Sequence, residues 1–548
     1  MKKQTLSFSL LFTGLLVVFL FLAVLMVPAA QAQEIGNSIC KGITGPTFSL
    51  EGTELLGVYC YDGNHFYMVS KRTTRPRYFV SKFNESMELL DQKELKIVES
   101  AKGMSDLEIN SFIEHNKELY VVTKKKDSKA KKINYFVEQV DLGTLSTTGK
   151  KNKIYEIDYS EDGISKQNAI FFIQSKDKNM LVVYDVYLAF KGENVTVHAK
   201  AMDKEFTTIW QKEVNIPVGD RTDNYRRTNG IIGGTNEFIS PFEVSCIDSS
   251  ANLYILAKVY NSSKLKDFDG GKLNFDYKIC MIGGAVQAYR DVNFNLTRPI
   301  RYVDINSNKK GEIVAFATYA DIAPNGKEKT KDQGIFLAML DPFNQKLKAG
   351  NYNKFTDAAL YAFQGKKYFA PYKTKAIFFE DNGGCRIVSE EYRYIETLDV
   401  SRGTKDKECA ANNIMILNVN SSAKAEQVTV IPKSQHMLAY SGLCSFLAFY
   451  GEDNYDFFFY DHNDNIHGPS DKMKELDFSL KDASYVHVRV KPDGARTKED
   501  VVIKYEEESK NPYLYLEDCG VINNHEVLFL AHDGRTVQKW VRFSLKDQ

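Results

Sequence analysis

Four aromatic residues followed by five polar ones form the stretch that most suggests chemistry, FFFYDHNDN at 457–465. Asp461, Asn463 and Asn465 alternate, as the oxygen ligands of a calcium loop do. Such a loop also needs glycine at its sixth position and glutamate at its twelfth, where this chain has isoleucine and lysine. We therefore interpret the aromatic run as a buried strand and the polar run as its turn, because Asp and Asn side chains hydrogen-bond the backbone in turns.

A second cluster of carboxylates lies in the stretch KDFDGGKLNFD at 266–276. Asp267, Asp269 and Asp276 surround a pair of glycines, and carboxylate oxygens are preferred ligands of calcium. The alternative is a tight turn, because Gly-Gly after Asp permits positive φ angles. We expect the turn, and these three aspartates are our candidate site for a structural calcium ion. The sequence indicates no other cofactor.

Adjacent carboxylates at Glu390 and Glu391, in the stretch SEEYRY, suggest the chemistry of a glycosidase. Such an enzyme needs two acids that face each other across the substrate. Neighbouring residues on a strand point to opposite faces of the sheet, so these two cannot form that pair. We expect solvated or salt-bridged glutamates at the surface, and we assign no catalytic residue.

The sequence lacks the other common catalytic and metal-binding patterns. Its nine histidines are scattered, and it contains no H-E-x-x-H, zinc spacing, G-x-S-x-G or P-loop. A basic run, KKKDSKAKK, occupies residues 124–132. We interpret this run as a solvated hairpin loop, with binding of phosphate or polysaccharide as the lesser alternative.

Composition favours a large β protein without a global charge. The chain has 548 residues, of which 43% are hydrophobic, so it can build a sizeable core. Lys plus Arg equals Asp plus Glu at 71 each, and this balance makes nucleic acid a poor candidate partner. The 31 Tyr and 35 Phe favour strands.

The N-terminal segment has the pattern of an export signal. Two lysines precede the apolar run Leu10–Val27, and Ala30 and Ala32 occupy the small-residue positions of a cleavage site. We expect a signal peptide at 1–32, with an uncleaved anchor in the inner membrane as the alternative. After cleavage, no segment remains that could span a bilayer.

One strand–turn–strand phrase recurs beyond this segment. NKELYVVTKKKD precedes INYFVEQVD, ANLYILAKVYN precedes LNFDYKICMIG, and NNHEVLFLAHDG precedes TVQKWVRFSL. Short strands, few helices and a long repeat are typical of a β-propeller of four-stranded blades. We expect an all-β protein with seven blades, six to eight being possible, in a single domain at 46–548 that follows a linker at 33–45. The alternative is a pair of tandem β-sandwiches.

Several phrases resemble a group of uncharacterised exported proteins of Bacteroidota-type bacteria. They include MDKEFTTIWQKEVNIP, CIDSSANLYILAKVY, RIVSEEYRYIETL and VIPKSQHMLAYSGLCSFLAFYGEDNYDFFFYDHNDN, all between residues 200 and 465. The resemblance implies a signal peptide and a propeller-like fold. It implies no catalytic residues.

The eight cysteines invite a disulfide framework in an exported chain. Cys246 and Cys280 fall on the first and third strands of one expected meander, too far apart to bond. Cys385 and Cys409 fall at mismatched ends of neighbouring strands. We therefore predict mostly free, buried thiols.

Two functions of different class remain open. We expect an exported protein of the bacterial envelope, periplasmic, at the cell surface or secreted, that binds or scaffolds without catalysis. Its partner would be a glycan, a peptide or another envelope protein. The alternative is a polysaccharide hydrolase or lyase whose acidic residues meet in the central funnel of the propeller.

Overall fold

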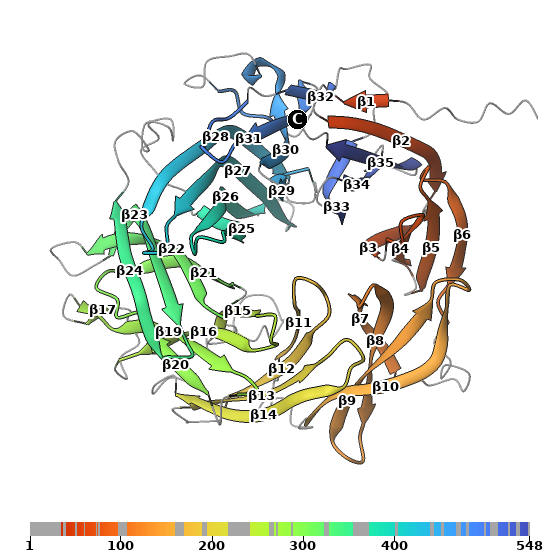
Figure 1. The fold of residues 1–548 in the computed structure, drawn as a ribbon. Helices are drawn as coiled ribbons and strands as arrows, with labels where there is room; N and C mark the ends of the chain where they lie inside the picture. Colours follow the sequence, from red (N-terminus) through yellow and green to blue (C-terminus); the bar gives the residue numbers. More distant parts are fainter. Residues whose placement is uncertain are drawn as a thin grey trace, which may run out of the picture.

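The computed structural model shows a ring of eight four-stranded antiparallel sheets (Figure 1). Each sheet is a blade, and its first strand lies nearest the centre of the ring. The expected all-β propeller with four-stranded blades is confirmed, and the alternative of tandem sandwiches is wrong. The protein has eight blades, within the expected range but one more than the number we favoured.

The structure describes residues 34–36, 40–49, 52–59, 61–72, 74, 77–96, 107–158, 169–188, 194–217, 242–261, 268–269, 272–285, 289–308, 310–322, 328–354, 372–399, 404–438, 443–450, 454–466, 473–477, 482–497, 500–504, 513–523, 526–532 and 537–545. The expected signal peptide at 1–32 lies outside these residues and stays a prediction. Within the described ranges, no helix has the length and apolarity needed to cross a bilayer.

From the centre outwards, blade 1 contains β3 (Thr53–Tyr59), β4 (His65–Arg72), β5 (Tyr78–Asn84) and β6 (Leu89–Glu94), and blade 2 contains β7 (Leu107–His115), β8 (Glu118–Asp127), β9 (Lys132–Asp141) and β10 (Ser146–Asp158). Blade 3 contains β11 (Ala169–Gln174), β12 (Leu181–Leu188), β13 (Asn194–Met202) and β14 (Thr208–Pro217). Blade 4 contains β15 (Phe242–Ile247), β16 (Leu253–Tyr260), β19 (Phe275–Ile282) and β20 (Arg290–Asn293). A small hairpin, β17 (Phe268–Asp269) and β18 (Lys272–Leu273), lies between β16 and β19 in the chain.

Blade 5 contains β21 (Ile300–Ser307), β22 (Ile313–Ile322), β23 (Glu328–Asp341) and β24 (Lys346–Lys354). Blade 6 contains β25 (Tyr372–Phe379), β26 (Cys385–Asp399), β27 (Thr404–Val419) and β28 (Ala425–Leu438). Blade 7 contains β29 (Phe446–Tyr450), β30 (Tyr455–His462), β31 (Ala483–Val490) and β32 (Asp500–Lys504). Blade 8 contains β33 (Tyr513–Asn523), β34 (Glu526–His532), β35 (Val537–Leu545) and β2 (Cys40–Ser49), and β1 (Glu34–Gly36) pairs with the outer edge of β2.

Blade 8 joins the two ends of the chain. Strand β2 pairs with β35 in an antiparallel register from Cys40–Leu545 to Ser49–Val537. Figure 1 shows these strands, at the red and blue ends of the colour scale, side by side. The segment 33–45, which we expected to be a linker, therefore contains β1 and the first half of β2.

The recurring phrase of the sequence corresponds to a recurring hairpin turn. In blade 4, the Asp248 carbonyl accepts the N–H of Ala251, and the Asp248 carboxylate accepts the N–H of Asn252 at 2.9 Å. Asn308 and Gly311 repeat this arrangement in blade 5. Ala251 and Gly311 both have positive φ angles, 58° and 74°. Short polar side chains at the first position thus fix the turns that start the second strands of blades 4 and 5.

The hydrophobic core lies between neighbouring blades. Between blades 7 and 8, for example, the ring of Phe458 stacks on Tyr485 and on Phe543, with centroids 6.0 Å apart in both pairs. Because each sheet is covered on both faces, its inner strands are apolar over long runs, as in β22, where the segment IVAFATYA is fully buried.

Cys409 and Cys444 form a disulfide that joins β27 to the start of blade 7. We did not predict this bond, because we compared Cys409 only with Cys385. The expected absence of Cys246–Cys280 and Cys385–Cys409 bonds is confirmed, and in the described part of the chain the cysteines outside this disulfide are Cys40, Cys246, Cys280, Cys385 and Cys519. Burial raises the pKa of the thiols of Cys246, Cys280 and Cys385 to about 12.

Candidate functional site

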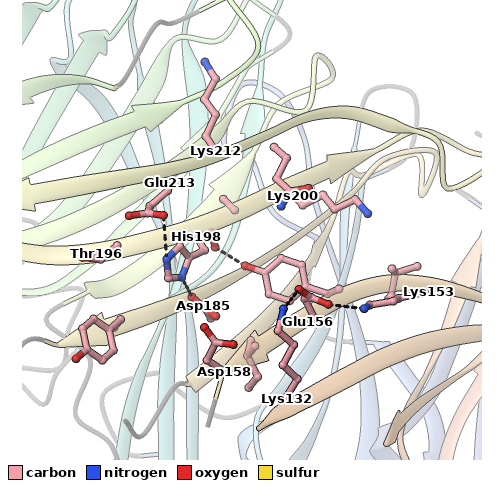
Figure 2. A pocket seen from close by; sticks show the side chains of 16 residues that line it. Lys132, Lys153, Glu156, Asp158, Asp185, Thr196, His198, Lys200, Lys212 and Glu213 are labelled. Carbon is pink, nitrogen blue, oxygen red and sulfur yellow. Dashed lines mark hydrogen bonds and ion pairs between the residues drawn. The ribbon is translucent and has the colours of Figure 1, made fainter. Parts of the chain in front are cut away.

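A groove of about 950 Å³ lies between blades 2 and 3. Strands β9 and β10 form one wall, and strands β12, β13 and β14 form the other (Figure 2). Its lining is mainly polar, although the remainder of the same interface, around Val137 and Val183, is apolar core. The groove is therefore the place where the two blades diverge and side chains of both reach solvent.

Blade 3 supplies a ladder of charged side chains across three strands. Asp185 on β12 is paired in register with His198 on β13, which is paired with Glu213 on β14. The alternate residues of β13, such as Val197 and Ala199, belong to the core towards blade 4. The period of two along a strand thus directs His198 to the groove and its neighbours to the core.

His198 is surrounded by carboxylates. Its Nδ1 atom lies 2.7 Å from Oδ1 of the buried Asp185, and its Nε2 atom lies 3.6 Å from Oε2 of Glu213. Figure 2 shows Asp158, from blade 2, beside this pair. The hydrogen bond to Asp185, and the charges of all three carboxylates, raise the pKa of His198. The geometry therefore favours an imidazolium at this position.

Blade 2 supplies a second charged group. The carboxylate of Glu156 lies 2.5 Å from Nζ of Lys132 and also binds Nζ of Lys153. Hydrogen bonds from these two ammonium groups lower the pKa of Glu156 to about 2. This carboxylate remains ionised at neutral pH and cannot serve as a general acid.

Two further contacts fix the walls of the groove. The hydroxyl of Tyr155 on β10 donates a hydrogen bond of 2.7 Å to the carbonyl of His198, which ties blade 2 to blade 3. Lys212 points away from His198 (Figure 2) and donates a hydrogen bond of 2.6 Å to the carbonyl of Gly283 in blade 4. Lys200 is half-buried in the wall, and burial lowers its pKa, with the charge of Lys153 as a second cause.

The groove has hydrogen-bonding groups of both kinds, but its described residues place no nucleophile beside the histidine. None of these described lining residues is a serine or a cysteine. The one threonine among them, Thr196, donates its hydroxyl hydrogen bond to Asn215 at 2.7 Å. A His–Asp pair without a neighbouring nucleophile lacks the arrangement of covalent acyl transfer. This set of side chains is suited to holding a polar ligand.

Sequence reasoning did not find this groove. Only Lys132, in the basic run, and His198, as one of the scattered histidines, had been noticed. The available signal was a polar residue at alternate positions of two otherwise apolar strands, at Asp185 in LVVYDVYL and at His198 in VTVHAKAM.

The candidate calcium ligands occupy different settings. Asp276 is on β19, and its carboxylate accepts the backbone N–H groups of Asn295 at 2.9 Å and Leu296 at 3.2 Å. Burial raises its pKa. Asp269 is on the small strand β17, and Asp267 lies outside the described residues. In the described part of the chain, no three His, Cys, Asp or Glu side chains are grouped to hold a metal ion. The calcium site stays a prediction.

The interpretation of FFFYDHNDN as a strand and its turn is confirmed. Strand β30 buries all four aromatic side chains, and the polar residues form a short 3₁₀ helix at Asn463–Asn465. Nδ1 of His462 accepts the N–H of Asp464, and Oδ1 of Asp461 accepts the N–H of His462 and the amide of Asn465. These polar side chains therefore satisfy hydrogen-bonding groups of the backbone at the end of β30.

The expectation for Glu390 and Glu391 was wrong, because both side chains are buried. Glu390 lies on the face of blade 6 that packs against blade 7, where its charge is compensated by the buried Lys433. Glu391 accepts a 3.4 Å hydrogen bond from the amide of Asn413. Neither carboxylate is a solvated surface group.

No protein-family model matches the chain, and no curated protein matches its sequence. Similar solved structures include the β-propeller domain of the Trilobed protease from Pyrococcus furiosus, which is 10% identical, with a TM-score of 0.32, and matches 81% of this chain and 96% of that one. A protein of unknown function from Bacteroides caccae is 10% identical, with a TM-score of 0.24, and matches 69% of this chain and 93% of that one. Prolyl oligopeptidase B from Galerina marginata is 8% identical, with a TM-score of 0.32, and matches 80% of this chain but 47% of its own, so this chain spans about half its length. These scores are too low for functional conclusions, and the expected relationship to a Bacteroidota family stays a prediction.

Proposed function

We propose that this protein is a non-catalytic, glycan-binding propeller of the bacterial envelope, exported by the N-terminal signal that its sequence predicts. The groove between blades 2 and 3 carries the proposal. It combines acceptors, such as Asp158 and Glu213, with donors, such as Lys200, on walls that the sheets hold rigid. Sugar hydroxyls donate and accept at once, so a ligand of this kind uses both sets of groups.

The charges of the groove also favour a polyhydroxylated ligand. Four lysines and four carboxylates line it, so the lining has no excess of either sign apart from His198. A site whose charges are balanced gains little binding free energy from the net charge of a ligand. Specificity must then come from the directions of the hydrogen bonds to the ligand, which depend on the side chains that strands β13 and β14 hold in place.

Binding is better supported than the alternative of a polysaccharide hydrolase or lyase. A hydrolase needs a protonated carboxylic acid beside the scissile bond. Glu156 is unsuitable, because its two lysine partners keep it ionised. The groove is lined by strands β9, β10, β12, β13 and β14 and not by the innermost strands β7 and β11, whereas the alternative places its catalytic acids in the central funnel.

A glycan array with the mature protein, which we expect to begin at Gln33, tests the proposal. Gln211 and Glu213 are exposed residues of the outer strand β14 that line the groove. Replacing both by alanine removes at least two hydrogen bonds and should weaken glycan binding about tenfold or more. The matched control is Gln92→Ala/Glu94→Ala, because these exposed residues have the same types and spacing on the outer strand β6 of blade 1. Equal binding by both variants, or no glycan bound by the unmodified protein, would contradict the proposal.

A further inference from the structure

The hairpin that joins β8 to β9 is a strongly basic projection beside the groove. Residues 124–132 contain six lysines and a single acid, Asp127. Residues 125–131 are exposed. The carboxylate of Asp127 accepts the backbone N–H groups of Lys129 at 3.1 Å and Ala130 at 3.0 Å, so it serves as the cap of the turn. Below, we call residues 124–132 the basic hairpin.

Among the described residues, two glutamates form ion pairs with lysines at the two ends of the basic hairpin. Glu108 pairs with Lys124 at 2.9 Å, at the base of the hairpin. Glu156 is shared between Lys132 and Lys153. At the tip, Lys129 and Lys131 make none of the ion pairs found among the described residues. The tip therefore keeps its positive charge, on a protein whose overall formal charge is zero.

The basic hairpin adjoins the groove through Lys132. Lys132 is the last residue of the hairpin and the first of β9, and its side chain lines the groove. Figure 2 shows Lys132 and Lys153 on either side of Glu156, at the blade 2 wall. A linear ligand that lies in the groove and leaves along β9 would thus pass from a charge-balanced site onto a positive one.

From this adjacency we infer that the ligand is an anionic polysaccharide, bound by its hydroxyls in the groove and by its acidic groups on the basic hairpin. The inference rests on the proposed glycan-binding function. The hairpin contains no aromatic residue and no arginine, so it lacks the stacking platforms of single-stranded nucleic acid binding. Ala130 is its one apolar residue, so it lacks the apolar face with which an element inserts into a lipid surface.

The experiment compares a carboxylated glycan, a sulfated glycan and a neutral glycan of equal length, using oligogalacturonate, a sulfated dextran oligomer and a plain dextran oligomer. Titrations use the full mature protein and the variant Lys129→Gln/Lys131→Gln, whose side chains do not line the groove. The control, Lys346→Gln/Lys424→Gln, removes two exposed lysines in blades 5 and 6, on the opposite side of the ring (Figure 1).

We expect the hairpin variant to bind one or both anionic oligomers about three- to tenfold more weakly than the unmodified protein at about 0.05 M salt, because each exposed charge contributes modestly. The difference should shrink at about 0.5 M salt, where the screening length falls to a few ångströms. The control should match the unmodified protein. The carboxylated and sulfated arms identify which acidic group is recognised.

Three outcomes would overturn the inference, and they separate it from the proposed function. If the hairpin variant binds anionic oligomers normally while Gln211→Ala/Glu213→Ala does not, the groove binds glycans without help from the hairpin. If the neutral oligomer binds as tightly as the anionic ones, the hairpin is again not used. If no oligomer binds, but single-stranded DNA or vesicles of anionic lipid bind through Lys129 and Lys131, then both the inference and the glycan-binding function fail.

Discussion

The Nζ atom of Lys433 lies 2.7 Å from Oε1 of Glu390, and both side chains are completely buried. The other oxygen of Glu390 accepts a 2.6 Å hydrogen bond from the hydroxyl of Ser445. Lys433 also donates to Gln435, whose amide donates to the carbonyl of Tyr460 in blade 7. This buried network connects the outer strand of blade 6 with the second strand of blade 7.

Replacing Lys433 by methionine should lower the free energy of unfolding by about 3 kcal/mol, because it removes the buried partner of Glu390 and leaves this charge with the partly exposed Lys375, 3.4 Å away. Thermal and urea unfolding of the variant would measure the loss. The double variant Glu390→Gln/Lys433→Met should recover most of it. Lys424→Met, an exposed change in the turn before the same strand, should be nearly neutral. A Lys433→Met variant as stable as the original would show that the pair contributes little.

The disulfide should be present in the purified protein. Alkylation under denaturing, non-reducing conditions should leave Cys409 and Cys444 unmodified and label Cys40, Cys246, Cys280, Cys385 and Cys519. With its ends 35 positions apart in the sequence, the bond should stabilise the fold by about 2 to 4 kcal/mol over Cys409→Ala/Cys444→Ala. The difference should disappear in reducing agent. Labelling of Cys409 and Cys444 without reducing agent would contradict the assignment.

The stability that His198 contributes should depend on pH. Its carboxylate neighbours raise its pKa in the folded protein above the unfolded value of about 6.5. The contribution is therefore fully present below pH ~6.5 and is lost as the pH rises through the folded pKa. Melting temperatures of the unmodified protein and His198→Gln should differ most at acidic pH and converge at alkaline pH. Asp185→Asn removes the main cause of the shift and should reduce this pH dependence, whereas a difference that grew with pH would contradict the assignment.

Two substitutions in the stretch FFFYDHNDN should differ sharply in their effects. Phe458→Ala should cost about 3 to 5 kcal/mol, because the ring is fully buried between blades 7 and 8. His462→Ala removes only the acceptor for the N–H of Asp464 and should cost no more than about 1 kcal/mol. Urea unfolding of both variants measures the contrast. A large loss in the histidine variant, or bound metal that depends on it, would contradict the structural role of this turn.

The repeat could be predicted from the sequence because the hairpin turns depend on local residues. Asp248 and Asn308 fix their own turns, and the strands that follow are apolar in both cases. The strand β2, which completes the eighth blade, was not predicted because it does not have the composition of a strand. It contains two glycines and a proline, and its register with β35 shifts between Thr44 and Thr47. Pairing with a distant strand, and not local propensity, makes this segment extended.

Tertiary packing also explains why the groove and the buried charges were not predicted. Glu390 looks like a surface residue until the face of blade 6 that it shares with Lys433 is covered by blade 7. His198 gains its partners from two other strands of its own blade, and the opposite wall comes from blade 2. The alternation of residue types in a single sequence indicates that these side chains share one face of a sheet. It does not indicate which blade packs against that face.

The pairing of β2 with β35 means that the ring is closed by strands from the N-terminal and C-terminal parts of the described chain. During synthesis, β2 must wait without its partner until the ribosome has delivered the whole propeller. Until then, β2 lacks its neighbour, and the partial ring presents an open edge that can pair with other chains. Pairing of these two strands therefore requires a chain that contains both of them, because a chain shortened through β2 or β35 cannot complete the four strands of blade 8.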